Sequence, residues 1–194
     1  MAFHVYAAFT IEGEELTGET TLASIGDVDV SSGHLEVYEL NFGAERALRE
    51  GNKSGRAIGR HQLMPLRLVK RSDRTTPLLY EALSRGRRID GEIKLFDAHP
   101  DTGEIHQHFA VTLEQARLTA MTTTSPDVFD PEDSNRPMYD FLELVPHTIT
   151  YADVVHGTEF MDSGARSLRK KAGSSKAKSK KSSGKSKKDK KKKK

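Results

Sequence analysis

Apolar and polar residues alternate along several stretches of this chain, with the period of two that is typical of a strand buried on one face. Residues 3–11 show it most clearly, because their large or apolar side chains fall at positions 3, 5, 7, 9 and 11. Similar stretches cover residues 34–42, 66–69, 93–96, 105–121 and 141–151. Turn signals such as residues 101–103 separate them, so the pattern predicts a mainly β fold, an antiparallel sandwich or barrel.

Two features interrupt this alternation. The register of residues 105–121 shifts at Glu114 and Gln115, which predicts a bulge or a turn there. Residues 76–86 instead have a helical pattern, with Thr76 as the N-cap, Pro77 at the first position and Gly86 just past the end. Their apolar side chains form one stripe, so we expect a short helix over residues 77–85 that packs against the sheet.

Two connections are longer than turns require. Residues 43–62 form one of them, rich in Gly, Lys and Arg, and a loop of this length in a compact domain is usually functional or disordered. Residues 122–137 form the other and are rich in Pro and acidic residues. Opposite charges on two loops suit a head-to-tail assembly, and two solvated loops would show the same charges.

The charge of the chain divides it into two regions. Residues 1–165 carry 15 Lys and Arg against 27 Asp and Glu, a net charge of −12, and we take them as one domain. Residues 166–194 carry 16 Lys and Arg against a single acidic residue, and almost nothing that a fold could bury. We therefore expect a disordered, basic tail. Its candidate anion-contacting residues are the last lysines, Lys185, Lys187, Lys188, Lys190, Lys191, Lys192, Lys193 and Lys194.

The tail has two open interpretations. It is either a solvated segment that aids solubility, or a polybasic arm for nucleic acid, an acidic protein surface or anionic lipid. Because the tail has no aromatic residue, any binding to nucleic acid would be non-specific and strongly dependent on salt. A cytosolic, non-specific nucleic-acid-binding protein with a polybasic arm is thus an alternative function for the whole chain.

Composition excludes several classes of protein. No apolar run approaches the roughly 20 residues of a membrane-spanning helix, so we expect no membrane insertion. The first residues lack a basic segment followed by an apolar one, so we expect no cleaved signal peptide. The chain has no Cys, which excludes disulfides, a thiol nucleophile and cysteine-bound zinc.

The sequence offers little for catalysis. His106 and His108 are two residues apart, which puts both on one face of a strand, near His99 and Glu104. Histidines exposed on a strand explain this group more simply than a metal site, although a small metalloenzyme remains an alternative. Residues 51–54 resemble the end of a phosphate-binding loop, but its first glycine is missing. We therefore predict a protein that is not an enzyme, with no catalytic, cofactor or metal site.

Six stretches of the sequence carry a family resemblance. They are the start at residues 1–4, Asn-Phe-Gly-Ala-Glu-Arg at 41–46, Gly-Arg-His-Gln-Leu-Met-Pro-Leu at 59–66, the helical segment with its preceding turn at 72–83, Ile-Lys-Leu-Phe at 93–96, and Val-Thr-Leu at 111–113. In this order they resemble one known family, the hemolysin-coregulated proteins (Hcp) of the type VI secretion system. The resemblance covers roughly residues 1–155.

The resemblance implies a β-barrel of two sheets with one flanking helix, and hexameric rings that stack head-to-tail into a hollow tube. A contracting sheath would drive this tube out of the cell, with small effectors in its lumen and the spike protein as a further partner. The protein would be cytoplasmic during assembly and secreted through the apparatus. Residues 43–62 would be an extended loop reaching neighbouring subunits, and its candidate interface residues are Glu45, Arg46, Arg60 and His61.

Overall fold

The computed structural model describes residues 4–31, 33–48, 57–99, 101–127, 129, 133 and 136–163, and only the backbone of 47, 48 and 57–60. Almost all regular structure in these residues is antiparallel strand, which confirms the mainly β fold with one short helix. The elements in chain order are β1 (His4–Ile11), β2 (Glu14–Glu15), β3 (Ser24–Ile25), β4 (Val28–Asp29), β5 (His34–Asn41), β6 (Ala44–Leu48), β7 (Ala57–Leu63), β8 (Leu66–Arg71), α1 (Thr76–Arg85), β9 (Arg88–Ala98), β10 (Ile105–Thr124), β11 (Tyr139–Val145), β12 (Thr148–Asp153) and β13 (Thr158–Ser163).

Six strands close into a barrel, in the order β11, β8, β5, β1, β9, β10, with β10 pairing back to β11. The chain builds it in two halves, β1, β5 and β8 before the helix and β9, β10 and β11 after it. Two seams, β1 with β9 and β8 with β11, join the halves. Closure leaves the barrel strands without free edges, which removes the sites where strands of other chains would pair.

The alternation seen in the sequence sets which side chains fill the barrel. Ala7 and Phe9 of β1, Ile93 of β9 and Val111 and Leu113 of β10 are all buried in one core cluster. The apolar stripe of α1 contributes Leu79 and Ala82 to the same cluster. A second, smaller cluster lies on the outer face, where the β3–β4 hairpin covers Tyr6 and Phe96.

Two expected irregularities occur close to where the sequence places them. The β9–β10 register shifts between Leu113 and Ala116, and Gln115 has a φ of 49°, so the predicted bulge is confirmed. The helix begins one residue earlier than expected, with Thr75 rather than Thr76 at the N-cap. Gly86 ends it in the left-handed conformation, with a φ of 62°.

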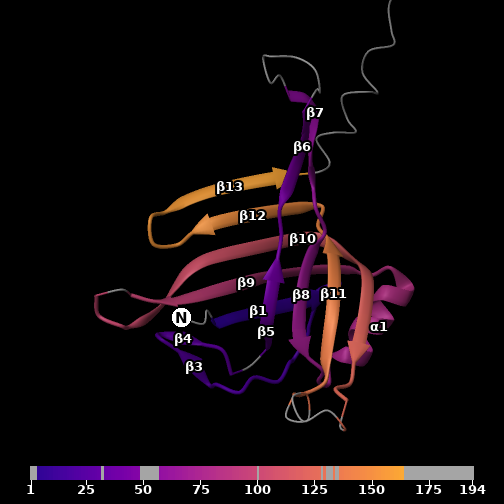
Figure 1. Cartoon of the computed structure of the whole chain (residues 1–194), viewed down its shortest axis with the longest axis vertical. Helices are drawn as coiled ribbons and strands as arrows, with labels where there is room; N and C mark the ends of the chain where they lie inside the picture. The colour runs from indigo at the N-terminus through magenta and orange to yellow at the C-terminus, as the bar shows by residue number, and fades with distance from the viewer. Residues whose placement is uncertain are drawn as a thin grey trace, which may run out of the picture.

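Other expectations need correction. The long connection is an arm rather than an extended loop, because β6 and β7 pair as a hairpin that projects from the barrel (Figure 1). The single strand expected over residues 141–151 is broken at Pro146 and His147 into β11 and β12. The tail, with its lysines, lies outside the described residues.

Candidate functional site

The β6–β7 arm carries the residues that the sequence singles out for subunit contacts. Arg46 lies opposite His61, and Glu45 lies opposite Gln62 in the ladder. Glu45, Arg46 and His61 are exposed, and Arg60 lies on β7. The hairpin thus brings four residues that are up to 16 positions apart onto two adjacent strands.

A stack of three aromatic rings holds the base of the arm against the β12–β13 hairpin. The rings of Phe42 and Tyr151 are 5.4 Å apart at 25°, and those of Tyr151 and Phe160 are 6.5 Å apart at 9°. Phe42 comes just before β6, whereas Tyr151 and Phe160 lie opposite each other on β12 and β13. Stacked rings add to the stabilisation from their buried area, so this stack fixes where the arm leaves the barrel.

A polar contact between β7 and β13 reinforces the stack. The imidazole of His61 meets the carboxylate of Asp162, whose side chain is only 13% exposed. Asp162 also acts on the stack itself: burial raises the pKa of the Tyr151 hydroxyl, and the negative charge of Asp162 raises it further. His61 therefore has a partner within its own chain, in addition to the role between subunits that the sequence predicts for it.

Strand β13 is an open edge of the main sheet in the described part of the chain, since it pairs with β12 on one side only. Four large apolar side chains in and just before it are at least half exposed, namely Val154, Val155, Phe160 and Met161. An open edge beside exposed apolar side chains is a surface on which another chain can pair. Sequence reasoning missed β13, because its adjacent apolar residues do not alternate.

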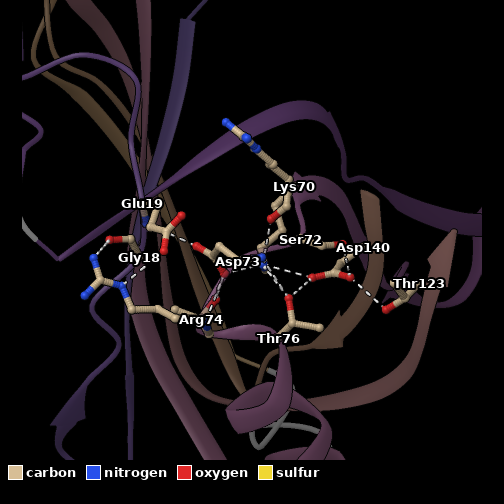
Figure 2. A network of polar contacts seen from close by, with 11 residues as sticks. Gly18, Glu19, Lys70, Ser72, Asp73, Arg74, Thr76, Thr123 and Asp140 are labelled. Atoms are coloured by element: carbon tan, nitrogen blue, oxygen red, sulfur yellow. Dashed lines mark hydrogen bonds and ion pairs between the residues drawn. The ribbon is translucent and has the colours of Figure 1, made fainter. Parts of the chain in front are cut away.

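Away from the arm, a buried ionic network joins the start of α1 to the barrel (Figure 2). The ammonium of Lys70, on β8, lies 2.8 Å from a carboxylate oxygen of Asp73 and 2.9 Å from one of Asp140. These three side chains are 1%, 3% and 0% exposed. Hydroxyl groups complete the coordination of Asp140: Ser72, Thr76 and Thr123 each donate a hydrogen bond to it.

The network keeps both carboxylates ionised despite their burial. Burial by itself would raise the pKa of Asp140, but hydrogen bonds from Thr76, Lys70, Thr123 and Ser72 outweigh it and hold that pKa below its ordinary value. At Asp73 the hydrogen bonds from Lys70 and Thr75 outweigh burial in the same way. The group is sealed from solvent, so we assign it a structural role rather than a catalytic one.

The histidines that the sequence brings forward do lie together on one surface. The rings of His99 and His106 are 5.9 Å apart, and those of His106 and His108 are 6.2 Å apart. In the parts of the chain that the structure describes, no three His, Asp or Glu side chains are placed to hold a metal ion. Among the same residues, no helix has the length and apolar character needed to cross a membrane.

In the described residues, the fold and its projections define a class of protein: a closed antiparallel β-barrel with a flanking helix, a projecting arm and an open edge strand, β13. The family described as "Type VI secretion system effector, Hcp" matches residues 10–154. The chain therefore belongs to the Hcp family, whose members are tube proteins of the type VI secretion system. A comparison with curated protein sequences gives no match.

Solved structures agree with this assignment at the level of the fold. A crystal structure of an Hcp protein is 20% identical, with a TM-score of 0.69, over 84% of this chain and 98% of its own. A mutant form of Hcp1 from the E. coli EAEC 042 pathovar is 18% identical with a TM-score of 0.64, over the same shares of the two chains. The secreted protein Hcp3 from Pseudomonas aeruginosa is 18% identical with a TM-score of 0.61, also over 84% and 98%. The predicted barrel of this family is thereby confirmed.

Proposed function

We propose that this chain builds the inner tube of a type VI secretion apparatus by forming hexameric rings that stack head-to-tail. The observation that carries this proposal is the contrast between the closed barrel and the open edge of β13. The barrel offers no other chain a strand to pair with, whereas β13 offers an unpaired edge with Phe160 and Met161 at 60% and 62% exposure.

The positions of the arm and of the β13 edge also suit a head-to-tail contact that repeats from one copy to the next. The arm and the β13 edge are different surfaces, so a contact between one of them and a different patch on the next copy is heterologous. A heterologous contact closes into a ring when its rotation divides a full turn, and it continues as an open helical filament when it does not. Rings that stack head-to-tail therefore need a second heterologous contact along the tube axis. We assign the arm residues Glu45, Arg46, Arg60 and His61 to contacts between copies.

The proposed role is mechanical. The tube would leave the cell through the apparatus itself, with the sheath, the spike protein and small effectors as its partners, and the effectors would travel in its lumen. No catalytic step is assigned to the chain.

The test is the size and shape of the assembled protein. We expect light scattering and negative-stain microscopy of the full chain to show hexameric rings, and Met161→Lys to weaken them because it puts a charge beside the pairing edge. The matched control is Leu78→Lys, which changes a residue that is 46% exposed on α1 and should leave the rings intact. A full chain that remains monomeric at high concentration, or rings that tolerate both substitutions equally, would contradict the proposal.

A further inference from the structure

An open depression of about 930 Å³ lies on the outer face of the sheet, around the bulge of β10. Its lining includes Thr10 of β1, Gly91 of β9 and Thr112 of β10. Carboxylates outnumber cations among its charged lining residues, which are Glu12, Asp90, Glu92, Glu114, Arg88 and Arg117. The depression is therefore a concave surface with a net negative charge.

The carboxylates that line the depression can form further ion pairs. Glu12 and Glu92 are 58% and 43% exposed, and their nearest ion pairs are 3.9 Å and 3.8 Å long. Charge-assisted hydrogen bonds are about 2.7–2.9 Å long, so these two pairs are loose. Among the described residues Glu114 forms no ion pair, while Arg117 already donates to the carbonyl oxygen of Gly86.

The described part of the chain ends near this depression and on the same face of the sheet. Ser163, the last described residue, lies opposite Thr148, and Thr148 lies opposite Glu114. Residues directly opposite each other on adjacent strands share a face. Strands are spaced about 4.8 Å apart, so Ser163 is about 10 Å from Glu114, a distance that the three residues leading to Arg166 can span.

We propose that the segment of residues 164–194 docks in cis on this depression, with its lysines and arginines against Glu12, Glu92 and Glu114. Charge favours this occupant, because the segment carries 16 of the 31 Lys and Arg residues of the chain. Attachment favours it as well, since a short tether gives the segment a local concentration in the millimolar range. The contact lies within one chain, so it does not depend on the proposed ring.

Disulfide trapping in the full chain tests the proposal, because the natural sequence has no cysteine. Ala172→Cys places one thiol in the tail and Thr112→Cys places the other in the lining of the depression. We expect rapid formation of a disulfide within one chain at low salt. Raising the salt should slow it, because exposed charges are screened over about 10 Å at 0.1 M.

The matched controls keep the same cysteine pair and change only charge. Glu12→Gln, Glu92→Gln and Glu114→Gln together should slow trapping about tenfold, the effect of three exposed ion pairs of ordinary strength. Asp27→Asn, Asp101→Asn and Glu104→Gln remove three exposed carboxylates that do not line the depression and should not slow it. Three results would each overturn the proposal, whatever the state of assembly. They are equal trapping rates in the two triple variants, a trapping rate that salt does not change, and disulfides that join different chains.

Discussion

Replacing Lys70 by Met should be the most damaging single change in the buried network. Methionine matches the length of the lysine side chain but removes the ammonium that lies 2.8 Å from Asp73 and 2.9 Å from Asp140. The hydroxyl donors would remain, so the variant isolates the loss of the positive charge. The two buried carboxylates, those of Asp73 and Asp140, would then lack a positive counter-charge.

The expected cost is large compared with the stability of a domain. Removing one partner of a buried ion pair typically costs about 3–5 kcal/mol, because the remaining charge is left without compensation. Folded domains are stable by only about 5–15 kcal/mol. The substitution should therefore lower the free energy of unfolding at pH 7 by about 3–5 kcal/mol.

The pH dependence gives a second signature. In the natural chain the pKa values of Asp73 and Asp140 are below the ordinary 3.8, so the stability they contribute is full above 3.8 and is lost as the pH falls through the lowered values. Without the ammonium, both pKa values should rise, because the hydrogen bonds from Lys70 are among the causes that lower them. Protonation then relieves the buried charge, so the deficit of the variant should shrink on mild acidification.

Urea unfolding followed by far-ultraviolet circular dichroism measures both effects, because the chain has no Trp for fluorescence. Protein concentration must be the same throughout, since assembly adds to apparent stability. Arg85→Met is the matched control: its ion pair with Glu81 is exposed and should be worth less than about 1 kcal/mol. A Lys70→Met variant that loses no more than this control, or whose deficit does not change with pH, would refute the reasoning.

Two further predictions concern packing. Gly91→Ala should destabilise the barrel by about 1–3 kcal/mol in the same urea assay, because a Cβ there would lie 2.2 Å from the buried ring of Phe9 and 2.4 Å from the carbonyl oxygen of Ala8. Gly43→Ala, which meets only Met64 at 3.6 Å, should cost much less, and equal losses would contradict the packing argument. Phe42→Ala removes the first ring of the aromatic stack, so it should speed amide hydrogen exchange in β6 and β7 while leaving β1 and β9 protected; unchanged exchange in the arm would show that the stack does not hold it.

The sequence predicts those elements whose residues alternate with burial or carry explicit end signals. The bulge at Gln115 follows from a shift in the apolar register, and the helix from Pro77 and Gly86. The arm and β13 are not predicted by this reasoning. Their described side chains are largely exposed, so no buried face imposes a pattern on them. The interface roles of the arm residues remain predictions.

Part of the buried network could be predicted from the sequence. Lys70 continues the inward series of Leu66 and Leu68, and Asp140 begins the inward series that continues with Leu142. A charged side chain at a buried position needs a partner of opposite charge, so this pattern predicts one. Which residue is that partner depends on the pairing of β8 with β11, and strands so distant in sequence are brought together only by the complete fold.

The position of Lys70 opposite Asp140 has a consequence for how the barrel folds. The two residues face each other across the seam that joins the two halves of the chain, so neither charge is neutralised by the other until that seam closes. Before closure, β8 and β11 are edges of separate half-sheets, and an inward charge makes such an edge a poor partner for any strand but the correct one. A slip of one residue would point Lys70 and Asp140 to opposite faces and expose the apolar series beside them. The ion pair thus favours the correct register when the two halves join, in a protein for which we propose that the edge of β13 pairs with other copies.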